Sequence, residues 1–153
     1  MANTCFQLFR SASHTLTLQL SGDLDEAGAL HCERDTRADL TLVVRPSLRV
    51  LWDLSALTSY SLESRLVVVR LQQFLSTKAL RTAYVATTPA ARSLALWAAR
   101  MGGQSAACIA ADLGGAEAWL RDQDESAVRI VLPRGLLSLR DPAGEWPRTA
   151  AGG

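Results

Sequence analysis

The sequence has few of the residues that bind metals or form disulfides. It contains 3 cysteines (Cys5, Cys32 and Cys108) and 2 histidines (His14 and His31), and no two cysteines have the Cys-x-x-Cys spacing of a zinc site. An odd number of cysteines also does not build the disulfide framework of a small secreted domain. We therefore expect no metal site, no cofactor, and a reducing compartment.

The sequence also lacks an excess of charge of one sign. It has 16 Lys and Arg against 15 Asp and Glu, a formal net charge of +1, so no basic field attracts phosphates and nucleic acid is not an expected partner. The start of the chain lacks the pattern of a signal peptide, and no apolar run approaches the roughly 18 residues of a membrane span. These absences predict a cytoplasmic protein with no membrane span. Among the basic residues only Lys78 is a lysine, a bias typical of a GC-rich bacterial genome.

The composition fits one globular domain of 153 residues, 48% of them hydrophobic. Alternation of apolar and polar residues predicts a β-hairpin over 5–10 and 15–20, ended by Ser21-Gly22-Asp23. An acidic start favours a helix over 24–39. Residues 40–44 look extended up to a turn at 45–47.

Short apolar runs then alternate with helical patterns. The expected elements are a strand at 48–54, a loop at 55–61, a helix at 62–77, a strand at 81–86, a helix from 89 to 101, a strand at 105–110 and a helix near 113–120. The order ββαβαβαβα predicts an α/β sandwich with a mixed, mostly parallel sheet.

This order carries two short motifs that point to a family. Leu20-Ser21-Gly22-Asp23-Leu24-Asp25 follows the second strand, and Asp53-Leu54-Ser55-Ala56-Leu57-Thr58 follows the third. Together with the segments at 81–86 and 116–120, they resemble the STAS superfamily, in particular its SpoIIAA-like branch of anti-sigma-factor antagonists. Residues 5–121 are accordingly expected to be a STAS/SpoIIAA-like domain. Residues 122–153 are expected to be a C-terminal extension, with a short strand at 128–132 and then an irregular tail.

The resemblance implies a cytoplasmic protein-interaction module and not an enzyme. Its partner would be a kinase-like anti-sigma factor or another regulatory protein, bound where the third strand meets the second helix. Phosphorylatable members carry an Asp-Ser pair there and a Gly two positions later, and the corresponding residues here are Ser61, Leu62 and Ser64. Leucine accepts no phosphate, so the usual phosphoswitch is not expected. Ser61 and Ser64 remain candidate phosphorylation sites, although helix capping is the favoured interpretation of Ser59, Ser61 and Ser64.

The second expected helix carries two apolar stripes, where a surface helix needs one. The wider stripe should face the sheet, and it consists of Val67, Val68, Leu71, Phe74 and Leu75. The narrower stripe should face either a protein partner, which includes a second copy in a homodimer, or the N-terminal loop or C-terminal tail of the chain itself. The predicted partner-binding residues are Ser59, Ser61, Leu62, Ser64, Leu66, Val69 and Gln73.

A different class of function is a carrier of a small apolar, lipid-like ligand held between helices and sheet and lined by Trp52, Trp97 and Trp119. The favoured interpretation of these tryptophans is core, since Trp97 and Trp119 recur at helical spacing with other apolar residues. Catalysis has little support. Cys32 is adjacent to His31 on one expected helix, and neighbouring helical side chains point about 100° apart. Asp23, Asp25 and Glu26 crowd a helix start, where carboxylates have a structural role.

Overall fold

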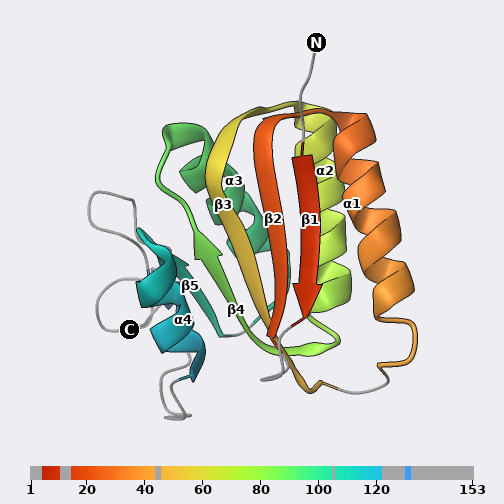
Figure 1. Cartoon of the computed structure of the whole chain (residues 1–153), viewed down its shortest axis with the longest axis vertical. Helices are drawn as coiled ribbons and strands as arrows, with labels where there is room; N and C mark the ends of the chain where they lie inside the picture. Colours follow the sequence, from red (N-terminus) through yellow and green to blue (C-terminus); the bar gives the residue numbers. More distant parts are fainter. Residues whose placement is uncertain (1–4, 11–14, 44–45, 105, 122–129, 132–153) are drawn as a thin grey trace, which may run out of the picture.

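A six-stranded sheet forms the centre of the fold, with its strands in the order β1-β2-β3-β4-β5-β6. The strands are β1 (Cys5–Arg10), β2 (Thr15–Leu24), β3 (Leu48–Tyr60), β4 (Ala79–Val85), β5 (Ala107–Ala110) and β6 (Ile130–Val131). β1 pairs antiparallel with β2, and every later pair is parallel (Figure 1). The computed structural model describes residues 5–10, 15–43, 46–104, 106–121 and 130–131. The predicted order ββαβαβαβα and the mixed sheet are confirmed. Of the expected C-terminal extension at 122–153, the structure describes only β6, which lies within the strand expected at 128–132. The other residues of the extension lie outside the described ones.

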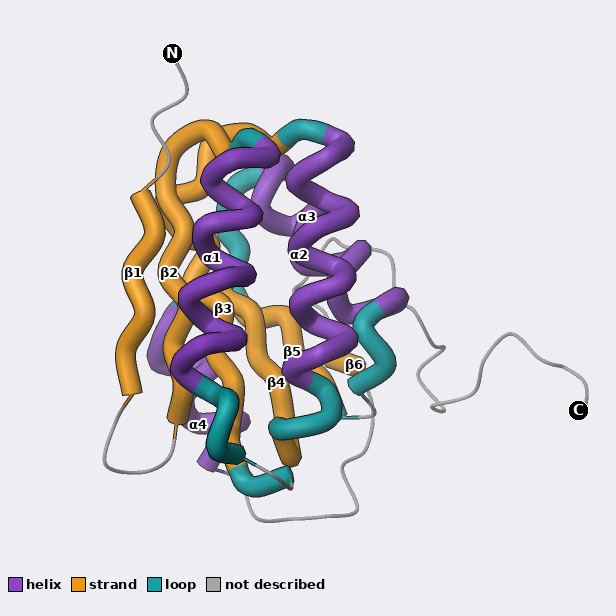
Figure 2. Tube along the Cα trace, turned by 90° about the vertical axis from the view of Figure 1, so that its right-hand side faces the viewer, coloured by secondary structure: helices purple, strands orange, loops and turns teal. Residues whose placement is uncertain are grey.

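The helices cover the two faces of the sheet unequally. They are α1 (Glu26–Asp39), α2 (Leu62–Leu75), α3 (Pro89–Met101) and α4 (Leu113–Arg121). The first three pack on one face, and α4 lies on the other (Figure 2). The alternation of β2 explains the larger core, because Leu16, Leu18 and Leu20 are fully buried beneath the three helices. The smaller core joins α4 to β3, β4 and β5 through residues such as Leu51, Ala83 and Leu120.

The helix starts follow from local capping chemistry. The Asp25 carboxylate accepts a hydrogen bond from Gly28 N at 2.8 Å, and the Thr88 hydroxyl accepts one from Ala91 N at 3.1 Å. Such side chains satisfy backbone donors that have no partner in the first turn of a helix. Pro89 occupies the first turn of α3, where its missing N–H costs nothing.

Two sequence predictions about β2 and β3 are wrong. Ser21-Gly22-Asp23 does not end β2, and 55–61 is not a loop, since β2 continues to Leu24 and β3 continues to Tyr60. The two extensions pair with each other, and register shifts occur between Gln19 and Ser21 and between Gly22 and Asp23. These irregularities, with Gly22 at φ 80°, break the period-2 pattern. The extended segment predicted at 40–44 is also wrong for residues 40–42, which form a turn after α1.

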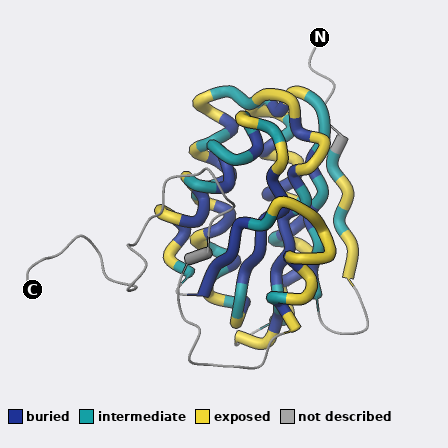
Figure 3. The backbone as a smooth tube through the Cα atoms, turned by 90° about the vertical axis from the view of Figure 1, so that its left-hand side faces the viewer, coloured by how far each residue is buried: buried dark blue, intermediate teal, exposed yellow. Residues whose placement is uncertain are grey.

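The burial of α3 corrects another prediction. Trp97 is 40% exposed, although its helical spacing predicted a core position. The buried face of α3 is instead made of Leu94 and small residues, namely Ala91, Ala95, Ala98 and Ala99. Alanines let a helix lie close to a sheet, which leaves no room there for an indole ring. In Figure 3 the buried residues accordingly follow the strands and the inner sides of the helices. Trp119 is half-buried against the smaller core, and Trp52 is fully buried.

Candidate functional site

The α2 helix packs one stripe against the sheet and exposes the other. Val67, Val68, Leu71 and Leu75 are buried, and Phe74 packs against them at the edge of the core. On the opposite side Leu62 is 57% exposed and Leu66 is 60% exposed. Val69 is half-buried and Gln73 is exposed between α2 and α3. The predicted orientation of α2 is therefore confirmed. The N-terminal loop and the C-terminal tail, the alternative covers of this stripe, fall on residues outside the described ones.

Two residues of α3 extend the exposed stripe. Trp97 is joined to α2 by the Arg65 guanidinium, whose carbon lies 4.1 Å from the ring centroid. Met101 is 52% exposed, and its backbone carbonyl accepts a hydrogen bond from Gln73 Nε2 at 3.0 Å. We define the α2–α3 surface as Leu62, Leu66, Val69, Gln73, Trp97 and Met101. The helical spacing of Trp97 predicts a core position, and the competing alanine stripe of α3 is the signal against that prediction.

The serines at the start of α2 form a capping box. Ser61 Oγ accepts a hydrogen bond from Ser64 N at 3.1 Å, and Ser64 Oγ accepts one from Ser61 N at 2.9 Å. Ser64 Oγ also donates to the Ser61 carbonyl oxygen at 2.8 Å, and the Ser64 side chain is fully buried. The favoured capping interpretation is confirmed for these two serines. Both hydroxyl groups therefore fix the first turn of α2, which begins at Leu62.

Ser59 belongs to a separate polar group on the β2–β3 ribbon, by which we mean the paired ends of these strands at 21–24 and 56–60. Its hydroxyl donates to Asp23 Oδ1 at 2.8 Å, and the Thr58 hydroxyl donates to the same oxygen at 2.6 Å. These hydrogen bonds hold the pKa of the Asp23 carboxyl below its ordinary value, and the bond from Thr58 has the larger effect. Tyr60, at the end of the ribbon, has its hydroxyl 2.5 Å from that of Ser93 on α3. The residues at 55–60 thus form a hydrogen-bonded strand rather than a free loop.

Three elements meet at a polar network beneath α2. Trp52 Nε1 donates to Gln72 Oε1 at 2.7 Å, and both side chains are fully buried. Gln72 Nε2 donates to Ser76 Oγ at 3.2 Å and to Thr82 Oγ1 at 3.3 Å. The network ties α2 to β3 and β4, because breaking it would leave polar atoms buried without partners.

The contact between α1 and α2 is an ion-pair cluster. Arg70 Nη2 lies 2.5 Å from Glu33 Oε1, and Arg37 Nη2 lies 3.2 Å from Glu33 Oε2. The Arg70 guanidinium is the main cause that holds the pKa of Glu33 below its ordinary value, against the opposing effect of burial. Glu33 is almost fully buried, so the two arginines compensate a charge removed from water.

The candidate nucleophile considered from the sequence is poorly placed for chemistry. Cys32 is buried, and burial raises the pKa of its thiol to about 12. His31 lies on the surface, with its Nε2 3.3 Å from Asp35 Oδ2. Among the described residues no group of three or more His, Cys, Asp or Glu side chains is arranged to hold a metal ion. No helix in this part of the chain is long and apolar enough to cross a membrane.

Comparison with known proteins identifies the fold. No protein-family model and no curated protein matches the sequence. A solved structure of a DUF3478-family protein with a SpoIIAA-like fold from Shewanella loihica PV-4 is similar, with TM-score 0.62 and 16% identity over 78% of this chain and 95% of that chain. An anti-sigma factor antagonist from Mycobacterium paratuberculosis gives TM-score 0.60 and 16% identity over 78% and 96%. The structure of the anti-sigma factor antagonist SpoIIAA in its unphosphorylated form has a TM-score of 0.51 and 18% identity, over 76% of this chain and 98% of that chain. The chain therefore has the SpoIIAA-like fold.

Proposed function

We propose that this chain is a non-catalytic protein-interaction module of a bacterial regulatory system and acts in the cytoplasm. It presents the 55–61 segment and the outer face of α2 to a protein partner. The observation that carries the proposal is the exposure of Leu62 and Leu66, at 57% and 60%, on a helix whose other side is packed in the core. Contiguous exposed apolar residues on a soluble domain mark interaction surfaces.

The rigidity of α2 supports this role. The capping box fixes its start, Gln72 fixes its inner side and Arg70 fixes it to α1. A surface held in this way pays little conformational entropy when a partner binds, because few groups have to become ordered. Binding would then need complementary shape and chemistry rather than refolding of the helix.

The fold supports a regulatory partner. Two of the similar structures are of anti-sigma factor antagonists, so we propose a kinase-like anti-sigma factor or another regulatory protein as the partner, with a homodimer as the alternative. Leu62 stands where phosphorylatable members of the STAS superfamily carry their acceptor serine. We propose that this module is not controlled by phosphate at that position.

Phosphate on the neighbouring serines would act through the cap. A phosphate on Ser61 would add negative charge at the N-terminus of α2, which the helix dipole favours, and next to Leu62, where an apolar partner would have to desolvate it. It would weaken partner binding and leave the helix folded. The Ser64 hydroxyl is buried, so a kinase would reach it only after the first turn of α2 opens.

The proposal is tested by quantitative affinity capture with matched variants. Leu66→Glu should keep the thermal midpoint of the wild type, because a charge on an exposed helix position costs little, and should lose the partner. Leu30→Glu is the control, since Leu30 is a 42% exposed leucine on the outer side of α1. Equal recovery of the same proteins by wild type and Leu66→Glu would refute the role of this face. Failure of Leu66→Glu to fold would show that the stripe is core.

A second candidate, the carrier of a small apolar ligand, is favoured by one observation. Tyr84 is fully buried on the face of the sheet that α1, α2 and α3 cover, and its hydroxyl has no hydrogen-bond partner among the described residues. Such an atom costs about 1–3 kcal/mol, and a polar group of a bound ligand would satisfy it. Native mass spectrometry separates the two candidates, because a carrier retains a small molecule whereas a module retains a protein.

A further inference from the structure

We propose that the α2–α3 surface binds an acidic segment of a partner protein, in which carboxylates flank apolar side chains. This inference rests on the proposed function and names the chemistry of its partner. The apolar part of the surface comes from both helices, since Leu62 and Leu66 project from α2 while Trp97 and Met101 project from α3. The charged part comes from the arginines beside them.

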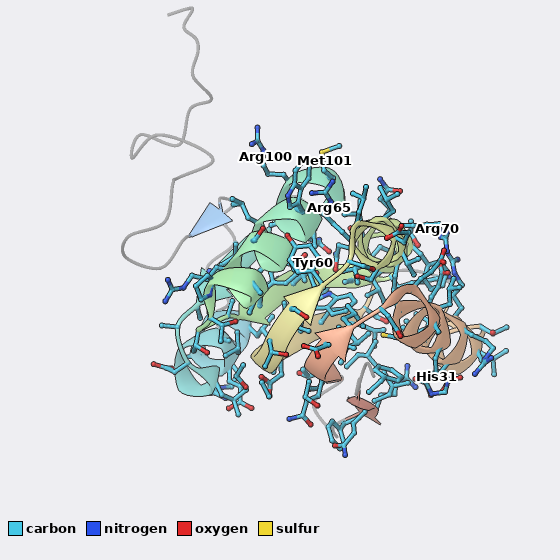
Figure 4. All side chains as sticks on the ribbon, turned by 90° about the horizontal axis from the view of Figure 1, so that it is seen from above. His31, Tyr60, Arg65, Arg70, Arg100 and Met101 are labelled. Atoms are coloured by element: carbon cyan, nitrogen blue, oxygen red, sulfur yellow. The ribbon has the colours of Figure 1, made fainter. Side chains whose placement is uncertain are left out.

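The charge of the two helices is strongly one-sided. α3 contains Arg92 and Arg100 and no acidic residue, and α2 contains Arg65, Arg70 and the single acidic residue Glu63. Arg70 points to α1, where it pairs with Glu33, and Arg92 donates to the Thr87 carbonyl oxygen at the start of α3. Two other arginines border the α2–α3 surface: Arg65, placed against Trp97, and Arg100, next to Met101 in the chain. Figure 4, which is seen from above, shows the labelled Arg65, Arg100 and Met101 on the same outer side of the helices.

Arg65 has the geometry of a carboxylate binder. Its guanidinium carbon lies over the Trp97 ring, 4.1 Å from the centroid. A guanidinium on an aromatic face keeps its planar fork of N–H donors for a carboxylate. Within the part of the chain that the structure describes, no carboxylate lies within 4 Å of Arg65. A partner carboxylate could thus form a bidentate pair with Arg65 while its neighbouring apolar side chains contact Leu66 and Trp97.

The same charges disfavour a second copy of this chain as the occupant. A two-fold contact would bring the same patch of each copy together, so Arg65 and Arg100 of both copies would be crowded at one interface. The two copies together would bring four arginines and only two glutamates, the Glu63 of each α2, to the interface, and like charges at an interface weaken association. An anionic membrane shares the required charge, but helices that lie on membranes carry polar faces rich in Lys and Arg. This surface has two arginines and no lysine.

The test is a selection from a random peptide display library on the immobilised full chain, followed by affinity measurements on the enriched peptides. We expect the enriched peptides to combine apolar residues with Asp or Glu and to lose affinity for Leu66→Glu. Arg65→Glu should weaken them about tenfold or more, the size expected for one charge-assisted hydrogen-bonded pair. Added salt should weaken them as well. Arg34→Glu, on the exposed side of α1, is the matched charge-reversal control and should bind them like the wild type.

Several results would overturn the inference. Peptides that depend on Leu66 but carry no acidic bias, or that keep their affinity for Arg65→Glu and Arg100→Glu, would refute the acidic partner and leave the proposed function standing. Peptides that ignore Leu66, or no enrichment, would refute the docking surface itself, and only the capture experiment with Leu66→Glu would then decide the proposed function. Flotation with phosphatidylserine vesicles that is lost in Arg65→Glu would assign the surface to a membrane. A dimer in solution that is lost in Leu66→Glu would assign it to a second copy.

Discussion

The Arg65 guanidinium covers the Trp97 ring at 4.1 Å, and this contact joins α2 to α3 on the solvent side of the molecule. The inner sides of the same helices meet the sheet through aliphatic residues such as Leu71 on α2 and Ala95 on α3. Trp97 of α3 therefore lies on the solvent side of the α2–α3 contact, and not between α3 and the sheet. This position leaves Trp97 40% exposed and limits what it contributes to stability.

The exposure of Trp97 predicts a modest effect of Trp97→Ala. Truncation of a fully buried tryptophan costs about 3–5 kcal/mol, whereas an exposed cation–π contact is worth roughly 0.5–1 kcal/mol. We expect Trp97→Ala to cost clearly less than Trp52→Ala, because Trp52 is fully buried and donates to Gln72. Urea denaturation of both variants measures the difference. Equal losses would mean that Trp97 is a core residue after all.

The capping box predicts a stability effect at the start of α2. Ser61→Ala removes the acceptor for Ser64 N and should lower the free energy of unfolding by about 0.5–2 kcal/mol. Ser59→Ala is the control, because the exposed Ser59 hydroxyl bonds to Asp23 outside the helix. Chemical denaturation of the two variants gives the comparison. A similar loss in Ser59→Ala and none in Ser61→Ala would contradict the assignment of Ser61 as the N-cap.

The Glu33 cluster predicts how stability depends on pH. Arg70, and to a lesser degree Arg37, hold the pKa of Glu33 below its ordinary value in the folded protein. A depressed carboxyl pKa stabilises the fold fully above the unfolded pKa, about 4.3, and this contribution is lost as the pH falls through the folded pKa. The melting temperature of the wild type should therefore fall more steeply than that of Glu33→Gln between about pH 5 and pH 3. Parallel melting curves for the two proteins would show that Glu33 is not coupled to folding.

The buried thiols predict slow alkylation. Burial raises the pKa of Cys32 to about 12 and that of Cys108 to about 11. Since the thiolate is the nucleophile, iodoacetamide at about pH 8 should leave both residues unmodified in the folded protein. The same reagent in guanidinium chloride should modify both. Peptide mapping by mass spectrometry reads each site separately. Rapid labelling of Cys32 in the folded state would mean that α1 opens locally.

Elements whose signals are local can be predicted from the amino-acid sequence. The alternation at 15–20 predicts which face of β2 is buried, and Pro89, a residue that favours the first helical turn, marks the start of α3. The two stripes of α2 were visible for the same reason, since a helical period places Leu62 and Leu66 on one side and Val67 and Leu71 on the other. The helical period alone therefore predicts which side of α2 is buried.

The end of β3 and the position of Trp97 depend instead on contacts between segments that are distant in the chain. Residues 55–60 carry no clear period, and they form a strand because residues 21–24, more than thirty positions earlier, supply the pairing partners across a bulged ladder. Two apolar stripes of α3 have helical spacing, one that contains Trp97 and one made of alanines, so periodicity allows either stripe to face the sheet. The choice depends on how closely α3 approaches the sheet and on the presence of Arg65 across the helix contact, and both are properties of packing between distant segments.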